Sequence, residues 1–107
     1  MEEFLYRLEP ARAGMVIEGP TAREAEIVGA HFAYLESLTR EGRVLLAGRT
    51  DTGDARVFGI VIFRAEDLAA ASALMKADPA VAEGVMRGEV FPFHLALWAP
   101  RDALGKL

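Results

Sequence analysis

The sequence contains no cysteine, asparagine or glutamine, and only two histidines. Without cysteine the chain can form no disulfide, no thiolate nucleophile and no thiolate metal site. Arginine outnumbers lysine ten to two, and this bias together with the missing amides is typical of thermophilic proteins, although a GC-rich genome produces a similar arginine bias. If the source is thermophilic, we expect a melting temperature above the range of ordinary mesophilic domains.

Basic runs, a signal-peptide pattern and long apolar stretches are also missing. The formal net charge is −4 and the arginines are spread singly, so we expect no nucleic-acid partner. The start, MEEFLYRL, carries two glutamates where a signal peptide requires positive charge. Apolar runs such as VFGIVIF are far too short to span a bilayer. We therefore expect a cytoplasmic protein with no membrane partner.

The length and the hydrophobic content predict one folded domain over residues 1–107. The chain has 107 residues, of which 52% are hydrophobic and 26% charged. This length suits one hydrophobic core and is too short for two. The composition is far from that of disordered chains, which combine low hydrophobicity with high net charge.

Strand-like and helix-like patterns alternate along the chain. Thr21 and Glu24 have the spacing of a capping box, and Gly42 is placed to end the helix that follows. We expect strands at 4–8, 43–48, 56–64 and 90–98, a helix from Thr21 to about Arg40, and a second helix at 66–77. This order predicts an α+β fold, the ferredoxin-like βαββαβ arrangement with a four-stranded antiparallel sheet and both helices on one face.

The other face of that sheet requires a cover. VFGIVIF is apolar on both of its alternating faces, and His94, Ala96 and Trp98 give the last expected strand a second, partly apolar face. Pro92, near the expected start of that strand, favours an edge position. Because a second copy of the sheet is the simplest cover, we expect a two-fold homodimer packed through the sheet face.

His31 is the first candidate for chemistry. On a helical wheel the expected core stripe of the first helix consists of Ala25, Val28, Phe32 and Leu35. His31 lies about 60° to one side of Val28, where a side chain can point into a groove between helix and sheet. It either titrates there near neutral pH, as functional histidines do, or packs as a partly buried histidine bonded to a backbone carbonyl. The two histidines of the chain have no tight ligand spacing, so we expect no metal site.

Asp78 is the second candidate, and its local sequence offers a structural explanation. Asp78 precedes Pro79, a strong helix start in which the carboxylate accepts backbone N–H bonds, and Gly84 can end the turn. This capping role accounts for Asp78 by itself. A carboxylate has several acceptor sites, however, so capping leaves room for a second bond to an imidazole.

Other residues are weaker candidates for a pocket. Gly48 and Arg49 end the second expected strand, where Arg49 either holds an anionic substrate group or is an ordinary surface arginine. Tyr6 and Tyr34 either line the pocket or belong to the core, as aromatic residues at strand and helix spacing usually do. Residues 15–17 are apolar within an expected loop, and we expect them to contact a partner subunit rather than fold over a ligand.

Two separate segments carry a family resemblance. HFAYLESLTREGRVLLAG, residues 31–48, and ADPAVAEGVMRGEVFPF, residues 77–93, resemble the signature segments of the YCII-related (YciI-like) family. The resemblance implies a ferredoxin-like dimeric α/β barrel whose site pairs His31 with Asp78. Val28 and Arg49 depart from the family pattern, in which a basic residue and a proline are common at these positions. Some members of the wider superfamily isomerise, dehydrohalogenate or oxidise small cyclic or aromatic compounds without a metal.

The leading interpretation is a small enzyme with a metal-free, cofactor-free His-Asp site. In it His31 is the general acid or base, Asp78 orients it, and the reaction is of the isomerase, lyase or dehydrohalogenase type on a small organic substrate. The alternative is a non-catalytic module of the same fold that binds a small ligand or another protein. An enzyme requires a solvent-reachable His31 coupled to Asp78, whereas a module tolerates a packed His31 and an Asp78 that serves only as a cap.

Overall fold

The computed structural model describes residues 1–99 as one antiparallel sheet with helices. In chain order the elements are β1 (Glu2–Pro10), α1 (Gly14–Ile17), α2 (Ala22–Arg40), β2 (Val44–Arg49), β3 (Gly59–Ala65), α3 (Leu68–Lys76), α4 (Pro79–Ala82) and β4 (Met86–Pro92). The sheet order is β2-β3-β1-β4, and every neighbouring pair is antiparallel. The expected ferredoxin-like α+β fold is confirmed, with the short helices α1 and α4 added to it.

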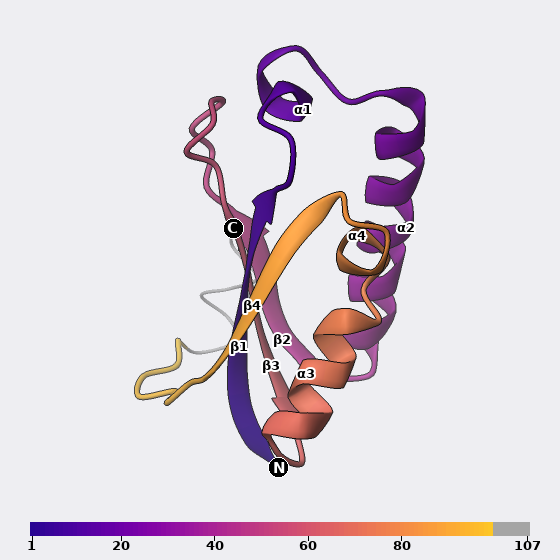
Figure 1. Ribbon diagram of the computed structural model, residues 1–107. Coiled ribbons are helices and arrows are strands. Elements are labelled where there is room, and N and C mark those ends of the chain that lie inside the picture. Colours follow the sequence, from indigo (N-terminus) through magenta and orange to yellow (C-terminus); the bar gives the residue numbers. More distant parts are fainter. Residues whose placement is uncertain (100–107) are drawn as a thin grey trace.

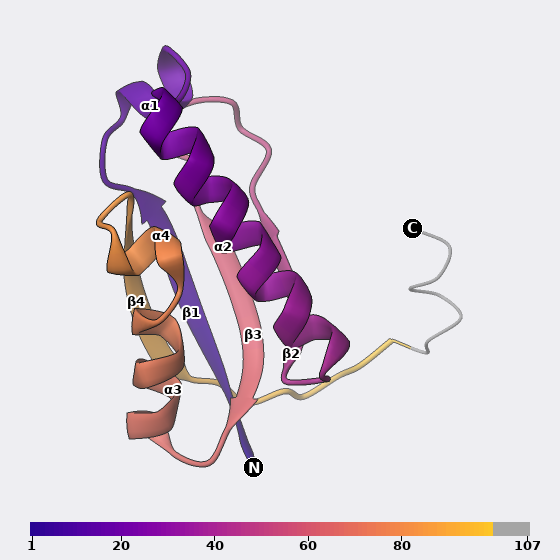
Figure 2. The same cartoon turned by 90° about the vertical axis from the view of Figure 1, so that its right-hand side faces the viewer.

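The helices form one layer over one face of the sheet. Figure 1 shows the sheet nearly edge-on with α2, α3 and α4 on the same side. In the turned view of Figure 2, α2 crosses the sheet obliquely, while α3 and α4 follow each other beside it. α2 packs over β2, and α3 and α4 pack over β4. In the part of the chain that the structure describes, no helix covers the opposite face.

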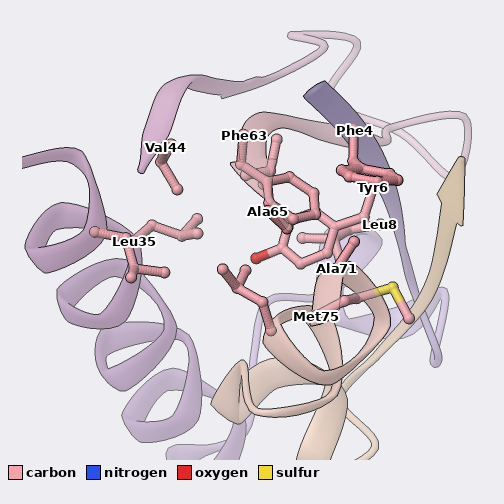
Figure 3. Close-up of a cluster of buried hydrophobic side chains, with 12 residues drawn as sticks. Phe4, Tyr6, Leu8, Leu35, Val44, Phe63, Ala65, Ala71 and Met75 are labelled. Carbon is pink, nitrogen blue, oxygen red and sulfur yellow. The ribbon is translucent and has the colours of Figure 1, made fainter. Parts of the chain in front are cut away.

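The core lies between the two layers and follows the alternation of β1. Phe4, Tyr6 and Leu8 are buried on the face toward the helices, as expected from their period of two. The Tyr6 ring packs against Phe63 of β3 at a centroid distance of 5.5 Å and an interplanar angle of 51°. In Figure 3 the phenol oxygen of Tyr6, drawn in red, points out of this aromatic cluster toward the helical layer.

The ends of α2 follow the local rules that its sequence indicates. The Thr21 hydroxyl accepts a hydrogen bond from the Glu24 backbone N–H, and the Glu24 carboxylate accepts one from the Thr21 backbone N–H. Beyond Arg40 the chain turns at Gly42, whose φ of +78° lies in the left-handed region that favours glycine. The predicted capping box and the predicted helix end are both confirmed.

The expected core stripe of α2 is partly wrong. Ala25 is exposed and the Phe32 residue is 66% exposed, whereas Leu35 and Leu38 are buried. The side chain of His31 is only 14% exposed, so it lies on the inward face rather than beside it. Apolar residues occur nearly all round this helix, and hydrophobicity alone therefore does not determine which side turns inward. We attribute the observed rotation to the buried leucines and to the hydrogen bond that His31 makes.

The last strand lies earlier in the chain than the expected range 90–98. β4 pairs with β1 from Pro10↔Met86 to Phe4↔Pro92, and there β1 reaches its first residues. The chain then passes the start of β1, where the Phe93 backbone N–H donates to the Glu3 carbonyl. The alternating apolar residues after Pro92 thus find no strand to pair with among residues 1–99. β4 is an edge strand, as expected, but Pro92 ends it instead of starting it.

Other bounds also differ from expectation by one to three residues, as in β1, which is longer than the expected 4–8, and two of the differences have local causes. The third strand begins at Gly59 instead of residue 56, because residues 54–57 form a turn in which the Asp54 side chain accepts from the Arg56 backbone N–H. The loop expected around residues 15–17 contains the single-turn helix α1, held by hydrogen bonds such as the one from the Glu18 backbone N–H to the Gly14 carbonyl. Both differences result from hydrogen bonds between residues close in sequence, which the alternation of apolar and polar residues does not predict.

A close approach between β4 and the helices positions α4. A Cβ atom at Gly88 would lie 2.9 Å from the Met75 sulfur and 3.2 Å from a methyl carbon of Val81. Because real Cβ contacts are longer than this, the strand can pass beneath α3 and α4 only where no side chain intervenes. This contact sets the height of α4, and with it of Asp78, above the sheet.

Candidate active site

Asp78 lies at the start of α4 and is fully buried. Its carboxylate caps the helix by accepting from the Ala80 backbone N–H at 3.0 Å, and Pro79 occupies the first turn. Gly84, with a φ of +72°, turns the chain after α4, as its position predicts. The cap uses only part of the acceptor capacity of the carboxylate. The remaining acceptor sites of the carboxylate face His31 of α2 and Tyr6 of β1.

His31 of α2 occupies the position opposite this carboxylate. Its Nδ1 atom lies 2.8 Å from Oδ1 and 2.8 Å from Oδ2 of Asp78. The structure therefore brings together the two residues that the sequence singled out, although 47 positions separate them. Asp78 is closed off from solvent, whereas part of the imidazole remains accessible. Only the histidine of this pair can meet a small molecule at the surface of the protomer.

Tyr6 of β1 completes the surroundings of the carboxylate. Its hydroxyl donates a hydrogen bond of 2.8 Å to Asp78 Oδ2, and the residue is fully buried. Tyr6 therefore belongs to the core, and it does not line a pocket that is open to solvent. The bond to Asp78 could not be predicted from the sequence, because 72 positions separate the two residues and no local pattern connects them.

Every neighbour that bonds to Asp78 can act as a donor. The Tyr6 hydroxyl, the Ala80 N–H and the Nδ1 atom of His31 surround the two oxygens, an arrangement that suits an ionised carboxylate, which only accepts. Burial raises the pKa of Tyr6, and the negative charge of Asp78 raises it further. The phenol therefore stays protonated at neutral pH and remains a donor. If Asp78 is ionised, it can only accept, and the proton of the His31–Asp78 bond lies on Nδ1 of the imidazole.

Tyr34 lies one turn beyond His31 on α2 but bonds elsewhere. Its hydroxyl donates a short hydrogen bond of 2.6 Å to the Leu74 carbonyl of α3. Burial raises the pKa of Tyr34, and the charge of Asp78 adds to this rise. Tyr34 thus joins the two long helices, and it is packed against the core cluster. No hydrogen bond joins its hydroxyl to Asp78 or His31 in the described structure.

Gly48 and Arg49 are the last two residues of β2. Both are exposed, and the Arg49 guanidinium lies 3.4 Å from the Asp51 carboxylate and 3.4 Å from the Thr50 carbonyl. Within residues 1–99 no hydrogen bond connects either residue to His31. Arg49 is therefore a surface arginine in this protomer. Its binding of an anionic substrate group stays a prediction.

The segment that contains residues 15–17 is tied to the start of α2. Arg12 donates to the Glu24 carboxylate at 2.9 Å and 2.6 Å. The Arg12 hydrogen bonds, followed by the bond from the Thr21 backbone N–H, lower the pKa of Glu24 to about 2. Met15 is partly buried, whereas Ile17 is exposed. The expected contact of this segment with a partner subunit stays a prediction.

A hollow of about 490 Å³ opens on the opposite face of the sheet from His31. It is lined in part by Arg7, Glu9 and Arg87, which alternate with the buried residues of β1 or lie beside them on β4. The Arg7 guanidinium lies 4.3 Å from the centre of the Phe58 ring and 2.9 Å from the Glu9 carboxylate. Its charge is therefore balanced within the chain, and the hollow lies apart from the His31–Asp78 pair.

No group of three or more histidine, aspartate or glutamate side chains in residues 1–99 is arranged to hold a metal ion. None of the helices in the same range is long and apolar enough to cross a membrane.

Comparison with known proteins identifies relatives of the chain. The family model described as the YCII-related domain matches residues 7–94. No curated protein matches the sequence. Among solved structures, the chain is similar to 5-chloro-2-hydroxyhydroquinone dehydrochlorinase from Burkholderia phenoliruptrix, in a complex with 2,5-dihydroxybenzoquinone. The match has a TM-score of 0.65 and 22% identity, and it covers 88% of this chain and 95% of that one. The likeness confirms the fold.

Proposed function

Because the chain belongs to the YCII-related domain family, we propose that it is a small-molecule enzyme in which His31 and Asp78 perform general acid–base catalysis. One observation carries this proposal. The imidazole Nδ1 lies 2.8 Å from both oxygens of a fully buried carboxylate, while the ring itself remains partly accessible. A helix cap needs no such partner, so the capping role of Asp78 does not explain the arrangement.

In this proposal each of the two groups has a separate role. Asp78 accepts the Nδ1 proton of His31, which fixes the tautomer and leaves the lone pair on Nε2. Nε2 then takes a proton from the substrate, and the carboxylate stabilises the imidazolium that forms. The same nitrogen can return the proton to another atom or release it to water. His31 is the general base and acid in this scheme, and Asp78 orients it.

Dehydrohalogenation is the reaction class that we propose first. The similar solved structure is named as a dehydrochlorinase of a chlorinated, hydroxylated ring. In such a reaction the ring reacts as its keto tautomer, in which the carbon that carries chlorine is tetrahedral. Nε2 of His31 accepts the proton of a ring hydroxyl, the electron pair of that O–H bond forms a second carbonyl through the conjugated ring, and the carbon–chlorine bond breaks with its electron pair so that chloride leaves. The substrate loses HCl overall, and no oxidant or reductant is consumed. A proton acceptor that is fixed in one tautomer is the group that this step requires.

Chloride release tests this proposal. We expect the protein to release chloride from chlorinated hydroquinones or hydroxyhydroquinones faster than the same protein after heat denaturation, measured with a chloride electrode. Small lactones and hydroxylated aromatic acids, followed by absorbance, extend the test to isomerase and lyase chemistry. Saturable binding of these compounds without any turnover would favour the alternative, a non-catalytic ligand-binding module. Neither binding nor turnover across the set would count against both.

We also propose that the protein acts as a homodimer through the uncovered sheet face. Strand register places Leu46, Ile62, Leu5 and Phe91 side by side across all four strands on that face. At the two ends of this band Leu46 is 43% exposed and Phe91 is 39% exposed in the protomer, whereas Ile62 is buried and Leu5 is partly buried. An apolar band of this kind favours a second copy of the sheet as its cover.

Light scattering tests the dimer. We expect twice the chain mass of 11.6 kDa at micromolar concentration, and a shift toward the monomer when Leu46→Glu places a charge in the apolar band. Glu89→Gln, on the same face but outside that band, is a matched control that keeps the dimer mass. A monomeric mass for the unmodified protein at tens of micromolar would contradict the proposal.

A further inference from the structure

The Asp78 carboxylate has a separate hydrogen-bond donor at each oxygen besides the histidine. The Ala80 backbone N–H binds Oδ1 at 3.0 Å, and the Tyr6 hydroxyl binds Oδ2 at 2.8 Å. Between them, His31 Nδ1 is equidistant from the two oxygens. The terminal torsion of an aspartate has a broad minimum, so one backbone bond alone does not fix the plane of the carboxylate. The second bond, from Tyr6, holds that plane toward the imidazole.

We propose that Tyr6 is a positioning residue for the acid–base site: its hydroxyl holds the Asp78 carboxylate in the plane that faces His31 and thereby keeps the proton on Nδ1. The inference about rate depends on the proposed function of the pair. The inference about geometry and proton position does not, because it concerns three side chains that contact one another in the folded protein.

Three observations favour positioning over direct contact with substrate. Tyr6 is fully buried, so it cannot reach a molecule in solvent. Its ring is fixed by Phe63 at a centroid distance of 5.5 Å, which directs the hydroxyl toward the helical layer. Burial and the charge of Asp78 raise its pKa, so the phenol stays protonated at neutral pH and remains a donor to Asp78. Tyr6 therefore acts on His31 only through Asp78.

Loss of the hydroxyl has a defined consequence. A hydrogen bond to an ionised acceptor is stronger than one between neutral groups, and a buried acceptor that loses its donor is left unsatisfied. In Tyr6→Phe the Oδ2 atom keeps only the imidazole as a partner, and the carboxylate is free to turn about its remaining bond to Ala80. The Nδ1 proton of His31 then spends more time unbonded and exchanges faster with water.

The test compares Tyr6→Phe with Tyr34→Phe. Both variants remove one phenol oxygen, but the Tyr34 hydroxyl bonds to the Leu74 carbonyl instead of Asp78. Nitrogen-15 and proton NMR of the His31 ring needs no substrate. We expect the Nδ1–H form in the unmodified protein and in Tyr34→Phe. In Tyr6→Phe we expect at least ten-fold faster exchange of the Nδ1 proton with water and a shift of the nitrogen signals toward a mixture of tautomers.

A second variant keeps the residue in place in case Tyr6→Phe folds poorly. The chain has two tyrosines, so 3-fluorotyrosine incorporated into Tyr34→Phe labels position 6 alone. Fluorination makes the phenol a stronger donor, and we expect slower exchange of the His31 Nδ1 proton than in unlabelled Tyr34→Phe. With a substrate in hand, Tyr6→Phe lowers kcat about ten-fold and leaves KM within two-fold, because Tyr6 does not contact the substrate.

The outcomes separate the two proposals. Exchange rates and tautomer signals in Tyr6→Phe equal to those in Tyr34→Phe, or no effect of fluorination, would overturn the positioning role even if His31 proves catalytic. A Tyr6-dependent change in the His31 signals in a protein that turns over none of the tested compounds would support the positioning role while the proposed function fails.

Discussion

Replacing His31 by glutamine is expected to lower the turnover of a halogenated ring substrate about 100- to 10,000-fold, the range that general acid–base groups contribute. The glutamine amide can still donate a hydrogen bond toward the Asp78 carboxylate, so the variant keeps a partner for the buried charge. It cannot accept a proton at neutral pH, however, and the loss therefore falls on kcat. Initial rates of chloride release over a range of substrate concentrations measure kcat and KM separately.

The second histidine of the chain supplies a matched control. His94 is exposed, and in the described residues no hydrogen bond or ion pair joins it to Asp78. His94→Gln makes the same chemical change outside the site and is expected to keep kcat within about two-fold. Turnover by His31→Gln within about three-fold of the unmodified protein would contradict the role of His31 as acid or base. Equal losses in both variants would point to a general effect of removing an imidazole.

Much of the fold could be predicted because it depends on local chemistry. The alternation of Phe4, Tyr6 and Leu8 marks the buried face of β1, and the spacing of Thr21 and Glu24 fixes the start of α2. These signals involve neighbours within a few positions, so sequence order alone contains them. The order of strands and helices then determines the ferredoxin-like topology through general rules of handedness.

The rotation of α2 could not be predicted in the same way. Phe32 is about as apolar as the leucines that α2 buries, so a helical wheel gives no reason to turn it outward. The inward direction depends on where Asp78 lies, and two strands and a helix separate α2 from Asp78 in the sequence. The end of β4 at Pro92 depends similarly on the length of β1, its pairing partner.

In the candidate site, too, the features that depend on neighbouring residues could be predicted, and those that depend on distant residues could not. The capping role of Asp78 could be predicted from the proline that follows it, and the structure confirms the cap. The pairing of His31 with Asp78 follows only from the resemblance to a family, since no spacing rule connects two residues 47 positions apart. Tyr6 is a weaker candidate in the sequence, because its strand pattern describes burial and contains no information about what its hydroxyl contacts.

Replacing Asp78 by alanine is expected to destabilise the protein by about 3–5 kcal/mol, the cost of breaking a buried, hydrogen-bonded charged group. The change removes the cap of α4 and leaves the Tyr6 hydroxyl and the His31 Nδ1–H without their acceptor inside the protein. Asp78→Asn keeps one carbonyl acceptor but points an amide NH₂ group at other donors. It is therefore expected to cost less, about 1–3 kcal/mol.

Asp67 offers a control that separates capping from the buried network. It caps α3 by accepting from the Ala70 backbone N–H at 2.8 Å, but it is exposed at the surface. Asp67→Ala is expected to cost about 1 kcal/mol, the usual value of an N-cap. Urea unfolding at one fixed protein concentration, extrapolated to zero denaturant, measures all three variants on one scale.

The comparison decides what the Asp78 carboxylate does in the folded chain. If Asp78→Ala costs no more than Asp67→Ala, Asp78 is a cap whose contacts with Tyr6 and His31 add nothing measurable. A loss larger by about 2 kcal/mol or more means that the bonds to Tyr6 and His31 stabilise the fold beyond the cap. The carboxylate then holds the imidazole with the same contacts that stabilise the protein, and a variant that frees the ring also weakens the core.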